Sequence, residues 1–436
     1  MSIIKLAWKN IINNPLSLLL SIILFALGIG LISFLLQFNK QVSEKFEANL
    51  ADIDLVIGAK GSPLQLILSS MYHIDNPTGN IKIEDAKPFL NPNHPLLKTS
   101  VPLSLGDNYH SYRIVGTNHD ILPLYKAQID EGNLWHDDLD VTIGHDVAQE
   151  TGLKVGDKFV SSHGFDHDDD LAHNDSSFKV TGILVPSGTV LDQLILTNTA
   201  SIWNVHNHES TEDNAENHKH SEEEHEHHNG HTHEGSLHDH DNSNADLLTH
   251  PEEQITSILI QYKNKTGLQA LNMPRAINEN TKLQAASPAY EINKLNNMVG
   301  IGTNTLKILG ILIAFVSAIS IFISLFKSLK DRKYELALIR VMGGSKIKLF
   351  TLVILEGLII SIIGFLIGII LSHLGMYFAG NFMEKDFRYS FNAFSFIKEE
   401  FLLALASLAI GLISAIIPAI QASNTEINET LSKKNF

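Results

Sequence analysis

Histidine is concentrated in one segment of the chain, residues 206–250. The segment holds twelve His and twelve Asp or Glu and has almost no large apolar residues, a composition typical of a disordered loop. Neutral imidazole is a good ligand for Zn²⁺, Cu²⁺ and Ni²⁺. We therefore predict several weak, exchangeable sites for zinc or a similar divalent metal, with seven candidate ligands: His225, His227, His228, His231, His233, His238 and His240. The alternative is a solvated acidic loop without metal.

A second, smaller cluster consists of His163, His167 and His173 with interleaved aspartates. It is equally consistent with an acidic hairpin tip. Because the chain has no cysteine, any metal site must use His and carboxylates. We expect no covalently bound cofactor.

No catalytic motif is visible in the long polar stretch. It lacks G-x-S-x-G, H-E-x-x-H and a kinase-like motif set. The sequence Gly58-Ala-Lys-Gly-Ser62 lacks the spacing of a phosphate-binding loop, and the chain contains no Walker motif. We therefore predict a non-catalytic protein and expect any ATPase activity in a separate partner.

Four uncharged apolar runs define the main elements of the chain. Each is long enough to cross the ~30 Å hydrocarbon core of a bilayer as a helix. The first is too long for a signal peptide and has no A-x-A-like cleavage site, so we interpret it as a retained anchor. The fold class predicted is a membrane protein with an α-helical four-span part, one plus three, and a large α+β extracytoplasmic domain between spans one and two. The runs are Leu16–Leu36, Ile308–Phe326, Gly357–Met383 and Phe401–Gln421.

The distribution of Lys and Arg predicts the orientation. Basic residues dominate residues 1–15, the connection 327–348 and the end of the chain. The positive-inside rule then places both termini and the 327–348 connection in the cytoplasm. The block between spans one and two lies outside, and we predict a multi-pass protein of a bacterial inner membrane.

Three domains follow from these boundaries. Residues 1–37 form an amphipathic helix and the first span, residues 38–300 the outer α+β domain, and residues 301–436 the three remaining spans. Strands and short helices intermix in the outer domain without a steady βαβ rhythm, which favours an α+β fold. The predicted strands are Val101–Leu105, Tyr112–Thr117, Val141–Ile143, Lys158–Ser161, Phe178–Val185, Gln193–Leu196 and Ile255–Tyr262, and the predicted helices include Asp146–Thr151 and Thr266–Asn280.

The connection 327–348 is a charged helix that breaks at Gly343-Gly344 and continues as an amphipathic helix into the membrane. Such an exposed helix-turn-helix is suited to bind another protein, although it could also be a solvated connector. Glu356 and His373 fall inside the third span, where ionisable groups are functional candidates. We expect Glu356 to have an interfacial or pairing role and His373 to lie near the outer surface. We interpret neither as a proton relay.

Several motifs resemble FtsX/MacB-like ABC-transporter permeases. Three segments are similar to that family. They are the stretch Arg332-Lys-Tyr-Glu-Leu-Ala-Leu-Ile-Arg-Val-Met-Gly-Gly-Ser345, the ending Ile416-Ile-Pro-Ala-Ile-Gln-Ala-Ser423 and the opening Leu6-Ala-Trp-Lys-Asn-Ile-Ile-Asn-Asn-Pro15. The middle of the chain resembles its periplasmic domain at Val115-Gly-Thr, Glu131-Gly, Ile143-Gly, Gly152-Leu-Lys-Val-Gly-Asp and Val180-Thr-Gly. The His-rich insertion departs from the general family.

The resemblance implies a mechanotransmitting permease that pairs with a second permease copy or homologue and binds cytoplasmic ATPase subunits. It places the coupling surface at Glu335, Arg340, Gly343, Gly344, Ser345 and Lys346. We expect the substrate to be a metal-loaded protein, a lipoprotein or a small molecule. The alternative is a regulatory scaffold that acts on an extracytoplasmic enzyme such as a cell-wall hydrolase. Membrane lipids and a periplasmic or outer-membrane protein are further expected partners, and nucleic acid is not.

Overall fold

The computed structural model describes residues 3–13, 15–162, 172–205, 243–387 and 391–424. The chain forms two compact units. One consists of Met1–Ser43 and Asn297–Phe436, and the other of Glu44–Asn296. We call them the helical unit and the inter-span domain.

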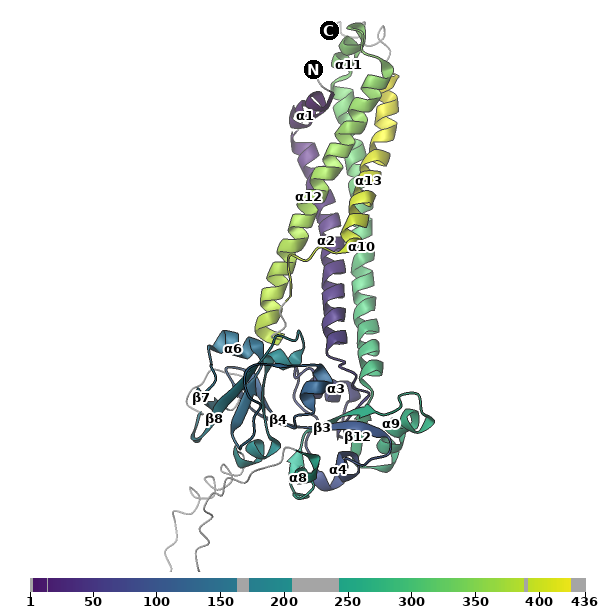
Figure 1. Ribbon diagram of the computed structural model, residues 1–436. Coiled ribbons are helices and arrows are strands. Elements are labelled where there is room, and N and C mark those ends of the chain that lie inside the picture. Colours follow the sequence, from purple (N-terminus) through teal and green to yellow (C-terminus); the bar gives the residue numbers. More distant parts are fainter. Residues whose placement is uncertain (1–2, 14, 163–171, 206–242, 388–390, 425–436) are drawn as a thin grey trace, which may run out of the picture. The chain divides into compact units, whose positions relative to one another are not determined.

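Four helices in the described part of the chain are long and apolar enough to cross a membrane, which confirms the one-plus-three arrangement. They run side by side, and two shorter helices, α1 and α11, lie at one end of the helical unit (Figure 1). Helices α2, α10 and α12 extend well beyond their apolar runs, because charged and polar turns continue them, whereas α13 exceeds its run by only a few residues. The bounds are α1 (Ile3–Asn13), α2 (Pro15–Ala48), α10 (Pro288–Asp331), α11 (Lys333–Val341), α12 (Lys346–Phe387) and α13 (Lys398–Ser423).

Small residues let the spanning helices pack closely. A Cβ atom on Gly30 of α2 would lie 2.9 Å from the carbonyl oxygen of Gly368 on α12. A Cβ on Gly357 of α12 would lie 2.8 Å from the carbonyl oxygen of Gly411 on α13. Close backbone approach increases van der Waals contact, which is the main attraction between helices in lipid. Two glycine-lined crossings therefore fix how α12 meets its neighbours.

The inter-span domain is built on one mixed sheet with short helices packed against it. The strand order is β12-β1-β11-β3-β4-β9-β6-β8-β5, with β7 beside β3 and β8. Pairs β4–β9 and β6–β8 are parallel and the other pairs in this sheet are antiparallel, which confirms the α+β class. The strands are β1 (Leu55–Ala59), β3 (Leu97–Tyr109), β4 (Tyr112–Thr117), β5 (Ile129–Gly132), β6 (Asp140–Ile143), β7 (Lys158–Ser162), β8 (Ala172–Leu184), β9 (Leu194–Thr197), β11 (Ser257–Tyr262) and β12 (Leu283–Ala286), with a separate pair β2 (Ile81–Lys82) and β10 (Gln254–Ile255).

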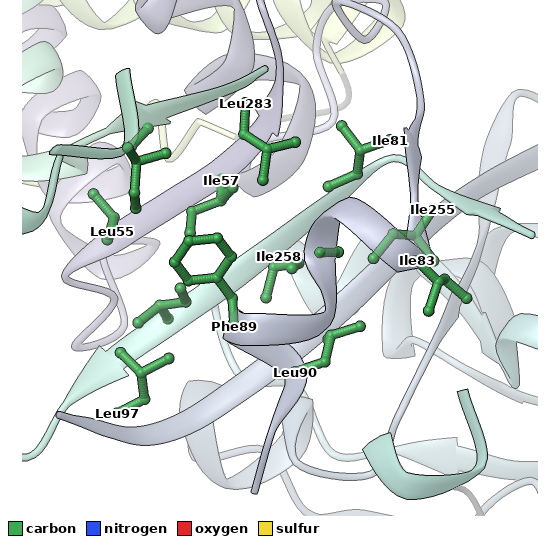
Figure 2. Close-up of a cluster of buried hydrophobic side chains, with 14 of the residues drawn as sticks. Leu55, Ile57, Ile81, Ile83, Phe89, Leu90, Leu97, Ile255, Ile258 and Leu283 are labelled. Carbon is green, nitrogen blue, oxygen red and sulfur yellow. The ribbon is translucent and has the colours of Figure 1, made fainter. Parts of the chain in front are cut away.

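Two apolar cores hold this domain. One lies between the sheet and the helices α4 (Ile83–Leu90) and α9 (Leu268–Asn280), and Figure 2 shows Phe89 and Leu90 of α4 facing Ile57 and Ile258. The other joins β4, β6, β8 and β9 to α6 (His145–Thr151). The remaining short elements are α3 (Pro63–Met71), α5 (Ile121–Tyr125), η2 (Val190–Gln193) and α8 (Asn244–Leu247).

Candidate functional site

Helix α11 and the turn after it form the predicted coupling segment. Gly343 adopts a left-handed conformation with φ +92°. Its N–H donates to the carbonyl of Arg340 at 3.1 Å, and the N–H of Gly344 donates to the carbonyl of Ile339 at 2.9 Å. These two bonds are the Schellman arrangement that ends a helix. The glycine pair therefore stops α11 and reverses the chain.

Both glycines are required by the geometry of this turn. The left-handed conformation of Gly343 is costly for any residue with a Cβ atom. A Cβ on Gly344 would lie 2.8 Å from the carbonyl oxygen of Ile339. The next residue, Ser345, caps α12, because its Oγ accepts a hydrogen bond from the N–H of Lys348 at 3.3 Å. The sequence Gly-Gly-Ser thus encodes one helix end and the next helix start.

The two faces of α11 differ in character. Leu336 is buried in a core with Ala7 of α1, Leu349 of α12 and Ala419 of α13, and Ala337 is buried as well. The other face exposes Glu335 together with apolar side chains, and Met342 in the turn is 72 % exposed. The exposed apolar residues of α11, of the turn and of the first turn of α12, which we call the α11 patch, are Tyr334, Leu338, Val341, Met342 and Ile347.

Glu356 lies at the centre of a buried polar network near this segment. Both of its carboxylate oxygens accept hydrogen bonds from Nη2 of Arg332 at 3.2 Å, and Asn10 donates to Oε1 at 2.7 Å. The side chains of Arg332 and Glu356 are 11 % and 4 % exposed. Arg332 stands between α10 and α11, and Asn10 belongs to α1. The carboxylate of Glu356 on α12 therefore contacts α1 and the junction between α10 and α11.

His373 belongs to a second buried network on α12. Its Nδ1 lies 2.7 Å from the carbonyl oxygen of Ala393, and its Nε2 lies 3.6 Å from Oε1 of Glu400 on α13. The same Glu400 oxygen accepts hydrogen bonds from Ser33 at 2.9 Å and from Gln37 at 2.5 Å, both on α2. The hydroxyl of Ser372 donates to that of Ser33 at 3.0 Å. We call this set the Glu400 network.

The carboxyl-terminal part of the chain matches a known family. Residues 307–427 match the family described as FtsX-like permease C-terminal. This stretch includes most of α10 and all of α11, α12 and α13. The chain carries an FtsX-like permease domain. The resemblance to FtsX/MacB-like permeases stated from the sequence is thus confirmed, and four helices of the described residues are long and apolar enough to cross a membrane.

Among solved structures, the chain is similar to the extracellular domain of the noncanonic ABC-type transporter YknZ from Gram-positive bacteria. The two share 12% identity, the match covers 54% of this chain and 99% of that domain, and the TM-score is 0.28. No curated protein matches the sequence.

The FtsX-like domain contains every residue predicted for coupling, and the structure places them all on α11, the turn and the first residue of α12. Glu356 is not part of that surface, because it is buried beneath it with Arg332. The sequence does not indicate the side-chain partners of Glu356 and His373, which are Asn10 and Arg332 for Glu356 and Gln37 and Glu400 for His373. Glu400 was read as part of a charged connection, because the apolar run begins only at Phe401.

The predicted metal ligands at His225–His240 lie outside the described residues, as do His163 and His167. Among the described residues, no group of three or more His, Asp or Glu side chains could hold a metal ion. The zinc hypothesis therefore rests on composition.

Inside the inter-span domain, the pKa of His73 lies well below its ordinary value. Burial, assisted by the positive charge of Arg113, lowers the pKa of His73 to about 3. Burial also lowers the pKa of Arg113, which donates to the carbonyl of Asp75 at 3.1 Å. A neutral imidazole beside a buried guanidinium is a packing arrangement that becomes unfavourable in acid.

Proposed function

We propose that this chain is the membrane subunit of an ABC transporter and that it docks a separate ATPase subunit through the α11 patch. The observation that carries the proposal is the two-sided character of α11. Its inner face is buried against α1, α12 and α13, while its outer face presents apolar side chains beside the charge of Glu335. An exposed apolar patch with a polar rim is typical of a protein–protein contact.

Continuous helices of the chain connect the region of this patch to the inter-span domain. Helix α10 ends at Asp331, and Arg332 links it directly to α11 while pairing with Glu356 of α12. At its other end α10 begins at Pro288, just after β12, and α2 ends at Ala48, shortly before β1. Because continuous helices are stiff along their axes, ATP-driven motion of α11 is transmitted to the domain as helix movement.

A charge placed in the α11 patch tests the docking. We expect Leu338→Glu combined with Met342→Glu to weaken co-purification with the ATPase at least tenfold, because a buried contact worth about 1.4 kcal/mol is a factor of ten in affinity. The control is Leu268→Glu, an exposed apolar residue of the inter-span domain. Unchanged ATPase binding by the double variant, in a correctly inserted protein, contradicts the proposal.

We further propose that a second permease copy packs along α10. The helix exposes an apolar stripe whose members lie within one narrow arc at 100° per residue. Asn39 of α2 donates a hydrogen bond to Thr303 of α10, so both helices carry polar side chains at this height. Met298 and Ile301 lie on α10 before Thr303, on the side of the inter-span domain, and are 62 % and 71 % exposed. Apolar side chains outside the hydrocarbon favour a protein neighbour over lipid. The stripe comprises Met298, Ile301, Ile308, Leu312, Phe315, Ile319 and Ile323.

Disulfide cross-linking tests this contact cleanly, because the protein has no native cysteine. Ile301→Cys is expected to give a cross-linked dimer in membranes. Leu306→Cys is the control, since it is also exposed but lies about 140° away around the helix. Equal cross-linking at both positions, or none at Ile301, counts against the α10 interface.

The His-rich segment is proposed to capture or sense zinc-like ions for this transporter. The composition of residues 206–250 supports weak imidazole sites whose binding falls as pH drops through ~6.5, where protons compete for the ring nitrogens. Replacing residues 207–242 by a short Gly-Ser linker should lower the zinc stoichiometry in calorimetry and leave thermal stability unchanged. If zinc binding at pH 7.5 is the same with and without the segment, the metal role is excluded and the permease role stands.

A further inference from the structure

The chain that enters α13 presents bulky aromatic side chains on its outer face. Residues 391–397, which we call the interhelix segment, bury Ala393 and Ile397 but leave Phe394 and Phe396 75 % and 79 % exposed. A segment surrounded by water gains more from burying the larger apolar side chains. The opposite arrangement here indicates an apolar surrounding at the outer face of the segment.

Hydrogen bonds from two helices hold the interhelix segment in place. Gln41 of α2 pairs with Asn392 twice, because its Nε2 donates to the carbonyl of Asn392 and its Oε1 accepts from the N–H of Asn392, both at 2.9 Å. On α12, Nδ1 of His373 lies 2.7 Å from the carbonyl oxygen of Ala393. The N–H of Phe394 donates to Oδ1 of Asn392 at 3.0 Å. The backbone that carries the exposed rings is therefore fixed to α2 and α12.

The same bonds make the segment compatible with lipid. Backbone outside a helix enters lipid only where the protein satisfies its N–H and C=O groups. The polar backbone groups around Phe394 have partners in Gln41, His373 and the side chain of Asn392. At the end of the segment, the carbonyl of Ile397 accepts from the N–H of Glu400 in α13 at 3.1 Å. An irregular segment with these partners needs little hydrogen bonding from water.

The contacts also give the height of the segment along the spans. Gln37 of α2 donates to Glu400, which directly precedes Phe401, the first residue of the apolar run of α13. Gln41, which holds Asn392, is one helical turn further along α2, or about 6 Å at 1.5 Å per residue. The headgroup region extends about 5–8 Å beyond each side of the hydrocarbon core. The segment therefore lies at the height of the lipid headgroups.

The start of α13 has the mixed character of the same border. Lys398 and Glu399 are exposed, and so are Phe401 and Leu402 in the following positions. Charged side chains there reach water, while rings and aliphatic chains lie among the ends of the acyl chains. Charged and large apolar side chains exposed within one helical turn are expected where hydrocarbon meets water.

We propose that the interhelix segment is an interfacial anchor whose Phe394 and Phe396 side chains insert into the lipid surface at this end of the spans. The partner is the bilayer itself, and a protein that covers the two rings is the competing arrangement. Because Gln41 and His373 hold the segment, the anchor fixes the height of α2 and α12 relative to the lipid.

Spin labelling of the full-length protein in nanodiscs of phosphatidylethanolamine and phosphatidylglycerol tests the anchor. The chain has no cysteine, so Phe394→Cys and Phe396→Cys each carry a single label. Collision rates are measured with oxygen, which concentrates in lipid, and with a water-soluble nickel chelate. The controls are Tyr290→Cys, an exposed aromatic residue of the inter-span domain, and Ile413→Cys, an exposed residue in the middle of the α13 apolar run. We expect oxygen-to-nickel ratios several-fold above that at Tyr290 and no higher than that at Ile413.

Two results overturn the proposal. A ratio equal to that at Tyr290 places the rings in water, and low collision rates with both reagents show that protein covers them. If Phe394→Cys does not fold, Ser395→Cys carries the label between the two intact rings, and the same ratio decides.

A second pair of variants tests whether Gln41 positions the anchor. In Gln41→Ala both hydrogen bonds to Asn392 are lost, so the spectrum of the label at position 396 should narrow as its motion increases. Asn39→Ala is the matched control, since it removes a hydrogen bond from α2 to Thr303 of α10 and leaves the segment untouched. Equal line widths in the two variants contradict the positioning role and with it the fixed anchor.

Discussion

The pairing of Arg332 with Glu356 makes a quantitative prediction. We consider Arg332→Met, which keeps the length and apolar stem of the side chain but removes its charge. Glu356 then remains buried with only the 2.7 Å hydrogen bond from Asn10. Leaving one member of a buried ion pair unpaired costs about 3–5 kcal/mol, and the 11 % exposure of Arg332 favours the lower end. We therefore expect a loss of about 3 kcal/mol in the free energy of unfolding.

The reverse substitution should cost less. In Glu356→Leu the unpaired group is Arg332, which lies at the end of α10 and can extend its long side chain towards water. The double variant, with both substitutions, replaces the pair by apolar contact. It is expected to lie within about 1 kcal/mol of wild type, because well-packed apolar groups replace buried ion pairs at little cost.

Reversible SDS unfolding of the purified protein measures these differences, and the four proteins form a double-mutant cycle. Lys82→Met is the control, since its partner Glu252 is exposed and such surface pairs contribute about 0–1 kcal/mol. The reasoning is refuted if Arg332→Met costs no more than Lys82→Met, or if the double variant is as unstable as the sum of the single ones.

Three further predictions concern the turn at Gly343, the buried His73 and the orientation of the chain. Gly343→Val should abolish the coupling of ATP hydrolysis to transport while the protein still inserts, because valine is strained at φ +92°. The control Gly300→Ala, in open space within α10, should leave transport unchanged. Equal transport by the two variants contradicts the role of the turn. The low pKa of His73 means that the unfolded chain takes up a proton below pH 6.5 that the folded one does not, so wild type should lose stability between pH 6.5 and about 3, and His73→Asn should lose less over this range in melts of the full chain. A reporter fused at Asn204 should be active only outside the cytoplasm, and a cytoplasmic signal there overturns the orientation inferred from Lys and Arg.

The elements with the strongest local patterns were predictable from the sequence. The four apolar runs fall inside α2, α10, α12 and α13, and the strand predicted at 112–117 is β4 with the same bounds. Each depends on a periodicity or an apolar length that a few neighbouring residues define. Strands β5 and β12 were missed. All four residues of β5 are exposed, so its sequence carries no apolar alternation, and β12 is only four residues long.

The turn at Gly343-Gly344-Ser345 was also readable, because helix ends and caps are local events. The hydrogen-bond partners of the ionisable groups in the spanning helices could not be predicted from the sequence. Asn10, Arg332 and Glu356 are joined over up to 346 positions in the chain, and Ser33 and Glu400 over 367. The sequence identifies Glu356 and His373 as ionisable groups at membrane depth, but no pattern in the neighbouring residues indicates their partners.

The sequence by itself thus determined the number of spans, the class of the inter-span domain, the family resemblance and the break after α11. All of these depend on patterns that can be read along the chain without knowing which distant residues meet in the fold. Only the tertiary structure decided which groups surround each buried carboxylate, Arg332 and Asn10 at Glu356 and Ser33, Gln37 and His373 at Glu400. The physical reason is that the cost of a charge in an apolar surrounding is set by the groups that the packed helices bring within hydrogen-bonding distance, and those groups come from distant parts of the chain.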